Sequence, residues 1–118
     1  MTKLLTTALK YHGTNPKGWK YPWCAAFLNL VLDELRVPHN KSLLARSFLD
    51  LGKPINVARV GDIVVFWRKE KKSIWGHSGL YINEDKTHIA ILGGNQDKSV
   101  CIKKYPKSRL LGIRRICV

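Results

Sequence analysis

The spacing of apolar residues changes once along the chain, and that change limits the folds that it can adopt. Up to Gly52 the apolar residues recur at helical intervals, whereas after Gly61-Asp62 they form short extended runs separated by turn residues. Helices followed by a succession of strands are typical of an α+β fold with an antiparallel sheet. With 118 residues, of which 45% are hydrophobic, the chain has room for one domain with a real core. We therefore expect residues 1–118 to form a single domain.

The pattern predicts three helices and about five strands. The helices are expected at about residues 2–12, 24–36 and 42–51. The run Ile63–Trp67 is apolar on both faces, which is typical of a central strand. Further strands are expected at residues 77–82, 88–92, 100–105 and 110–116. The predicted architecture is compact, with N-terminal helices packed on a C-terminal antiparallel sheet.

The charge balance is the most unusual part of the composition. The chain has 21 Lys and Arg against 8 Asp and Glu, a formal net charge of +13. No acidic residue follows Asp97, whereas these basic residues do: Lys98, Lys103, Lys104, Lys107, Arg109, Arg114 and Arg115. A field of this size attracts polyanions. Nucleic acid, lipopolysaccharide or teichoic acid on a bacterial surface, and acidic peptides are all candidate partners, and charge alone does not choose among them.

Two kinds of signal are missing from the sequence. The beginning of the chain lacks the apolar run of a secretory signal, and no stretch approaches the length that crosses a bilayer. We therefore expect a protein that stays in the cytoplasm in which it is made until it is released. Its three cysteines, Cys24, Cys101 and Cys117, fit neither a disulfide framework nor the paired spacing of a zinc site. Reduced thiols are expected, with a pairing of Cys101 and Cys117 on adjacent strands as the alternative, and neither a metal nor a cofactor is expected.

Cys24 lies at the start of the second expected helix. Pro22 fits just outside or at the start of a helix, because it cannot donate a backbone hydrogen bond and its φ is fixed. Cys24 then sits where unpaired N–H groups and the positive end of the helix dipole favour a thiolate. It is therefore a candidate nucleophile. The alternative is a small core residue beside Ala25 and Phe27.

A thiol nucleophile needs a base, and His77 is the candidate among the four histidines. It opens a strand beside Gly76, and alternation places His77, Gly79 and Tyr81 on one face. If the cysteine helix packs on that face, the imidazole and the thiol can meet. The alternative is a strand histidine that bonds to a backbone carbonyl. The other histidines are expected at the surface: His12, His39 and His88.

Two amide side chains follow Gly93-Gly94 and are candidates for holding His77. In an antiparallel hairpin, the end of the strand at residues 88–92 returns to the level where His77 begins. An amide there can accept the imidazole Nδ1–H and hold Nε2 toward the sulfur. Asn95 and Gln96 are both candidates for this role. Ordinary turn chemistry is the alternative for both.

Four segments, in this order and spacing, resemble the NlpC-type and CHAP cell-wall cysteine peptidases, where CHAP stands for cysteine, histidine-dependent amidohydrolase/peptidase. They are PWCAAF at residues 22–27, GDIVVF at 61–66, GHSGLY at 76–81 and LGGNQ at 92–96. The likeness is greatest to a small phage- and bacterium-associated branch with a Gly-Gly-Asn-Gln ending. Each motif alone is weak, but the four together are specific and cover about residues 21–112.

The resemblance implies a papain-like α+β fold that hydrolyses amide bonds in peptidoglycan without a cofactor. It implies that Cys24 is the nucleophile, His77 the general base, and Asn95, or failing that Gln96, the third polar residue. It also implies an oxyanion site made by the backbone N–H of Cys24 together with Tyr21. Neither a separate wall-binding domain nor an export signal is expected from the sequence, and in both respects it departs from the family pattern.

A peptidoglycan amidase or endopeptidase is therefore the expected function, most simply a phage-type endolysin. Such an enzyme would wait in the host cytoplasm, as a monomer, until the membrane is breached. Its basic face would bind anionic polymers of the bacterial surface in place of a wall-binding domain. The same active site could also belong to an antibacterial effector amidase that is delivered by a secretion machine.

A basic nucleic-acid-binding module is the alternative of a different class. The aromatics that could stack on bases are Trp19, Trp23, Trp67 and Trp75. No recognised nucleic-acid-binding motif is present, so no specific nucleic-acid partner is expected. Because Trp23 and Trp75 flank the candidate cysteine and histidine, they are candidates for a substrate groove, with core packing as the alternative.

Overall fold

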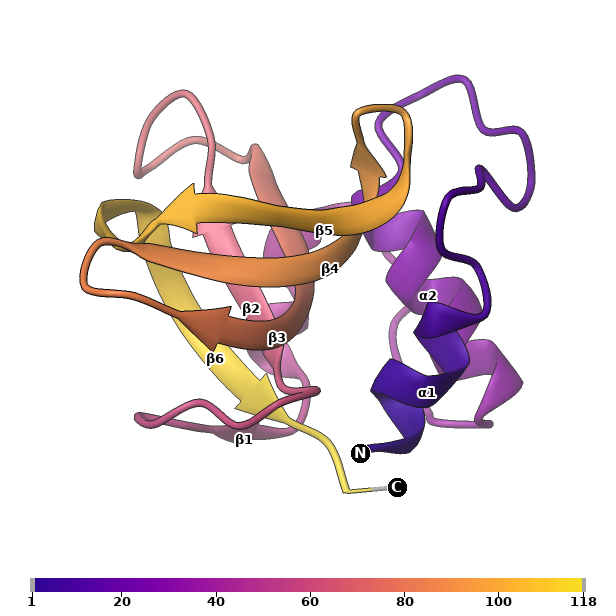
Figure 1. Cartoon of the computed structure of the whole chain (residues 1–118), viewed down its shortest axis with the longest axis horizontal. Coiled ribbons are helices and arrows are strands. Elements are labelled where there is room, and N and C mark those ends of the chain that lie inside the picture. Colours follow the sequence, from indigo (N-terminus) through magenta and orange to yellow (C-terminus); the bar gives the residue numbers. More distant parts are fainter. Residues whose placement is uncertain (1, 118) are drawn as a thin grey trace.

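Helices cover one face of a curved antiparallel sheet in the computed structural model, which describes residues 2–117 (Figure 1). The helical elements are α1 (Lys3–Leu9), α2 (Cys24–Glu34) and two 3₁₀ helices, η1 (Ala45–Asp50) and η2 (Lys107–Arg109). The strands are β1 (Lys53–Pro54), β2 (Ile63–Trp67), β3 (Gly76–Glu84), β4 (His88–Gln96), β5 (Ser99–Pro106) and β6 (Leu110–Arg115). They lie in the order β1-β6-β2-β3-β4-β5, and every pair is antiparallel. The predicted α+β class is confirmed, and the sheet has six strands because the two-residue β1 joins its edge.

The strand β2 is central, as its sequence predicts. It pairs with β6 on one side and β3 on the other. Ile63 and Val65 pack into the core between the sheet and the helices, whereas Val64 and Phe66 pack into a second apolar cluster on the opposite face. Both faces of β2 are therefore buried, which explains its uninterrupted apolar sequence.

The region before β1 differs from the predicted third α-helix. Only the short 3₁₀ helix η1 forms there, and its Phe48 reaches the core. Upstream, the backbone N–H of Ser42 donates to the Asn40 side chain and that of Leu44 donates to the Ser42 hydroxyl. Such local side-chain bonds compete with helical hydrogen bonds and keep the segment in a loop. Among the helices of residues 2–117, none combines the length and the apolar character that crossing a bilayer requires.

The Gly61-Asp62 motif fixes the entry into β2. Gly61 has a φ of 94°, and a Cβ at this position would lie 2.0 Å from the Thr2 hydroxyl. The buried Asp62 carboxylate accepts the Arg59 N–H at 2.8 Å and two bonds from the Arg115 guanidinium at 2.8 and 2.9 Å. This motif therefore joins the start of β2 to the end of β6 and has a structural role.

Candidate active site

Cys24 is the first residue of α2, so the predicted position at a helix start is confirmed. Its side chain is buried and lies in the wall of a cavity of about 400 Å³. At the first position of a helix its own N–H has no helical acceptor. The N–H groups of Ala25 and Ser78 and the Ser78 hydroxyl face its sulfur. The thiol therefore contacts β3 at the residue that directly follows His77.

Burial raises the pKa of the Cys24 thiol above its ordinary value, and this is the largest influence on it. The facing N–H groups, the Ser78 hydroxyl and the Arg68 charge lower the pKa but do not cancel the effect of burial. The expectation that the helix start makes Cys24 a thiolate is therefore wrong. The resting form at neutral pH is the thiol, which needs a base to become a nucleophile.

His77 lies near the start of β3, buried on the face of the sheet that points away from α2. It pairs with Phe66, and its ring stacks on that of Tyr105 with centroids 4.7 Å apart. The condition that the cysteine helix packs on the face of His77 is not met, because α2 packs on the face that carries Leu80. The space left by Gly79 is filled instead by the side chain of Ile91, which would lie 2.7 Å from a Cβ there.

The thiol and the imidazole therefore approach the first residues of β3 from opposite faces of the sheet. Cys24 reaches Ser78 from the side of α2, while the His77 ring lies on the other side. Cys24 opens onto one cavity and His77 onto a second, of about 290 Å³, and Arg68 lines both. Among the described residues, Arg68 is the one that the two linings share.

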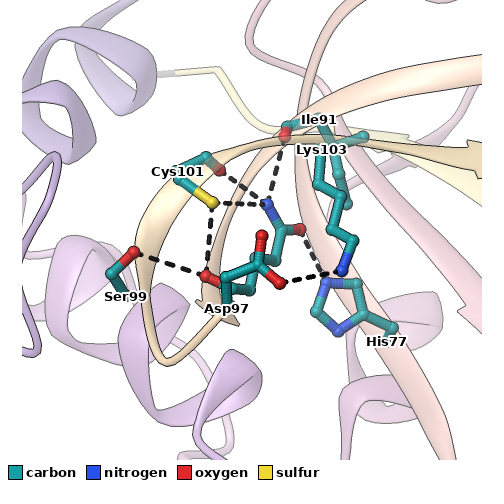
Figure 2. A network of polar contacts seen from close by, with 7 residues as sticks. His77, Ile91, Asp97, Ser99, Cys101 and Lys103 are labelled. Carbon is teal, nitrogen blue, oxygen red and sulfur yellow. Dashed lines mark hydrogen bonds and ion pairs between the residues drawn. The ribbon is translucent and has the colours of Figure 1, made fainter.

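Gln96, not Asn95, holds the imidazole. The Nε2 atom of His77 lies 2.8 Å from Oε1 of the buried Gln96 (Figure 2). The Gln96 amide nitrogen donates to the Cys101 carbonyl at 2.6 Å and lies 3.4 Å from the Ile91 carbonyl. These two acceptors turn the amide oxygen toward His77, so Nε2 carries the proton. Nδ1 is then the free base, which reverses the predicted roles of the two ring nitrogens.

The backbone of the Gly-Gly-Asn-Gln segment explains this choice. Asn95 has a φ of 57°, a left-handed conformation that Asn tolerates, and it makes no side-chain hydrogen bond within residues 2–117. A Cβ on Gly93 would lie 2.7 Å from the Gln96 amide oxygen, and one on Gly94 would lie 2.6 Å from Cβ of Phe27. The two glycines therefore make room for Gln96 on one face and for α2 on the other.

The imidazole is neutral at physiological pH. The pKa of His77 is lowered to about 4: burial is the main cause, the positive charges of Arg68 and Lys103 add to it, and the hydrogen bond that Gln96 accepts from the ring opposes both. The thiol and the imidazole thus both rest as neutral groups, and Nδ1 of His77 is free to accept a proton because Gln96 occupies only Nε2.

The remaining predicted site residues divide between the cavity and the core. Tyr21 and Trp75 line the cavity that contains Cys24, and Trp75 is 48% exposed. Trp23 is 2% exposed and packs against Trp19 with centroids 5.3 Å apart, so it is a core residue. Core packing, the alternative for Trp23, is therefore correct.

Sequence reasoning missed two residues of this region. Ser78 is fully buried, and its hydroxyl has no conventional hydrogen-bond partner in residues 2–117 although it faces the Cys24 sulfur. Arg68 begins the charged segment RKEKKS at residues 68–73, which by sequence is most simply a solvated hairpin tip, and only the fold reveals that it lines both cavities. Within the same residues, no three His, Cys, Asp or Glu side chains gather as a metal site requires.

The three cysteines are free thiols, as expected. Cys101 lies on the edge strand β5 and Cys117 follows β6, and three strands separate β5 from β6 in the sheet. The Cys101 thiol donates to the Gln96 carbonyl at 3.2 Å. No protein-family model matches the chain, and no curated protein sequence is significantly similar to it.

Proposed function

We propose that the protein is a cysteine amidase or endopeptidase that hydrolyses amide bonds in peptidoglycan, with Cys24 as nucleophile and His77 as general base. The observation that carries the proposal is the buried hydrogen bond between His77 Nε2 and Gln96. It fixes the ring and leaves Nδ1 as a base near the residue that the Cys24 thiol contacts. A histidine held in one tautomer by a polar side chain is the arrangement that thiol and serine hydrolases use.

The chemistry proceeds in two stages. His77 Nδ1 takes the thiol proton of Cys24, and the sulfur attacks the amide carbonyl carbon. The C–N bond then breaks, the proton passes from His77 to the leaving amine, and a thioester remains on Cys24. Water attacks the thioester while giving a proton to His77, which returns it to the departing sulfur. The products are a free amine and a carboxylic acid.

The negative oxygen of the tetrahedral intermediates needs donors. The N–H of Cys24 is available because the first residue of a helix has no helical acceptor. Tyr21 lines the same cavity, and its hydroxyl is the second proposed donor. A lost oxyanion donor costs about 3 kcal/mol of transition-state stabilisation in well-studied hydrolases.

Peptidoglycan is proposed as the substrate on two grounds. The four motifs resemble cell-wall cysteine peptidases, and a net charge of +13 suits a polymer with free carboxylates on an anionic surface. A phage-type endolysin that reaches the wall from the host cytoplasm is the simplest biological setting. An effector amidase would use the same chemistry. The nucleic-acid alternative is weakened because Trp23 lies in the core and cannot stack on a base.

The test is mass spectrometry of the fragments that the purified protein releases from purified peptidoglycan. The wild type is expected to expose new amines, and their identity will separate an amidase from an endopeptidase. Cys24→Ala is expected to release none, and Cys117→Ala, which removes an exposed thiol, to act as the wild type does. Equal release by Cys24→Ala and the wild type would end the proposal.

A further inference from the structure

The cavity that contains Cys24 has a predominantly apolar wall. Leu43, Ile74 and Trp75 line it, and each of these side chains is about half exposed or more. Such exposure of large apolar side chains around a concave surface is typical of a binding site for an apolar group. The cations of this wall are Arg68 and Lys69, and Lys69 lies over the Trp75 ring at 5.4 Å. Apolar surface therefore dominates next to the sulfur.

The cavity around His77 is polar and positively charged. Its wall holds Arg68, Lys103 and Arg109, and no Asp or Glu lines either cavity in the part of the chain that the structure describes. Lys103 forms an ion pair with Asp97 at 3.2 Å, and the Arg109 guanidinium lies over the Trp67 ring. The side chain of Arg68 makes no ion pair within residues 2–117. The second cavity is thus suited to an anion.

The proposed reaction assigns each half of the substrate to one cavity. The acyl half becomes bonded to the Cys24 sulfur, so it must occupy the cavity onto which the sulfur opens. The leaving amine must receive its proton from His77, so the amine half must occupy the cavity onto which the imidazole opens. The different chemistry of the two cavities then becomes a preference for the two sides of the scissile bond.

We infer that the substrate has an apolar acyl group on one side of the scissile amide and, on the other, an amine residue with a free carboxylate that Arg68 binds. This inference rests on the proposed function and adds the direction in which the substrate binds. An arginine suits the role because its planar guanidinium can donate two parallel hydrogen bonds to a carboxylate.

The backbone of Arg68 is well placed to support such a contact. Its N–H donates to the Trp75 carbonyl at 3.3 Å, and its carbonyl accepts the Ser73 hydroxyl at 2.7 Å. The base of the side chain is thus fixed directly after the buried strand β2. Its guanidinium acts on both reacting groups, because its charge lowers the pKa of Cys24 and of His77. A carboxylate bound there would lie beside the reaction centre.

The first test compares two synthetic substrates with the same apolar acyl group and the same leaving amino acid, one with a free carboxylate and the other with a carboxamide. We expect kcat/KM of the wild type to favour the carboxylate by at least about tenfold, mainly through KM. Arg68→Gln should abolish the preference. Lys86→Gln, which removes one charge from the exposed β3–β4 turn, should retain it. Equal rates in the wild type, or a preference that survives in Arg68→Gln, would overturn the inference.

The second test does not need hydrolysis. Cys24 is alkylated with iodoacetate, which is an anion, and with neutral iodoacetamide, and peptide mapping gives the rate ratio of the two reagents at this residue. The ratio cancels changes in thiol pKa because both reagents attack the same thiolate. We expect it to fall several-fold in Arg68→Gln and to stay unchanged at Cys117 and in Lys86→Gln.

The two tests distinguish failure of the proposed function from failure of the anion site at Arg68. A fall in the alkylation ratio without any hydrolysis of peptidoglycan would retain the anion site and reject the proposed function. Hydrolysis that depends on Cys24, together with an unchanged alkylation ratio and no carboxylate preference, would retain the function and reject the anion site.

Discussion

The replacement Gln96→Leu tests the residue that holds His77. Leucine is similar in size but has no polar atom, so it leaves the buried His77 Nε2–H without its acceptor and removes the bond to the part-buried Cys101 carbonyl. An unsatisfied buried polar group costs about 1 to 3 kcal/mol. The loss of both bonds should therefore lower the free energy of unfolding by about 2 to 4 kcal/mol, a large share of the stability of a small domain.

The assay is urea unfolding followed by tryptophan fluorescence, with Asn95→Gly as the matched control. Glycine accepts the φ of 57° at position 95, and the Asn95 side chain makes no hydrogen bond within residues 2–117. The control should therefore change the free energy of unfolding by no more than about 0.5 kcal/mol. Nitrogen NMR of the His77 ring adds a second readout, because the wild type should carry its proton on Nε2.

Two results would refute this reasoning. In the first, Gln96→Leu is as stable as the wild type and Asn95→Gly is strongly destabilised. Asn95 would then be the residue that holds His77. The other is a wild-type His77 with its proton on Nδ1, because Gln96 could not then be accepting from Nε2 as the observed geometry requires.

Three further predictions concern stability. The pKa of His77 is about 4 in the folded chain and 6.5 in the reference state, so the unfolded chain takes up the proton first as pH falls. The contribution of neutral His77 to the free energy of unfolding is therefore complete above pH 6.5, and roughly 3 kcal/mol of it should be lost between pH 6.5 and 4. Urea unfolding at a series of pH values measures this loss. His77→Gln should lose this dependence, and an unchanged slope in the variant would contradict the assignment. Asp62→Ala should lower the free energy of unfolding by about 3 kcal/mol, because it leaves Arg115 without its ion-pair partner. A double-mutant cycle with Arg115→Gln should show a coupling energy of at least about 1 kcal/mol, and additive effects would mean that the ion pair does not contribute to stability. Gly94→Ala should lower the melting temperature clearly, because its Cβ would lie 2.8 Å from the Trp23 ring, and a wild-type melting temperature would show that α2 can move away.

The periodicity of the sequence was enough to predict the order of the main elements. The apolar run Ile63–Trp67 predicted a central strand, and β2 is buried on both faces. The third helix was mispredicted because the Asn40 and Ser42 side chains bond to nearby N–H groups instead of leaving them to a helix. The strand β1 has only two residues, so it carries no periodic pattern to detect.

The sequence predicted the positions of Cys24 and His77 in their elements but not the geometry of the candidate site. Pro22 located Cys24 at a helix start, and the alternation of β3 grouped His77 with Gly79 correctly. Ile91, and not α2, fills the space at Gly79, and this is a tertiary contact that no local pattern encodes. The choice of Gln96 depends likewise on the left-handed backbone of Asn95.

The pKa of Cys24 is another property that the local sequence did not predict. The sequence indicated a helix start that would favour the thiolate, but burial in the folded chain has the larger effect and favours the thiol. Burial is a property of the whole packed structure, so a local motif cannot supply it. In the proposed mechanism His77 therefore takes the proton from Cys24, because the two groups do not rest as a thiolate and an imidazolium.

The most direct test of the account is to trap the thioester. The protein is mixed with soluble peptidoglycan fragments and quenched in acid within the first turnover, and the intact mass and peptide map are recorded. The account predicts an acyl adduct on the peptide that contains Cys24, which neutral hydroxylamine removes and which does not form in Cys24→Ala. Cleavage that proceeds in Cys24→Ala, with no adduct on the wild-type peptide, would contradict it.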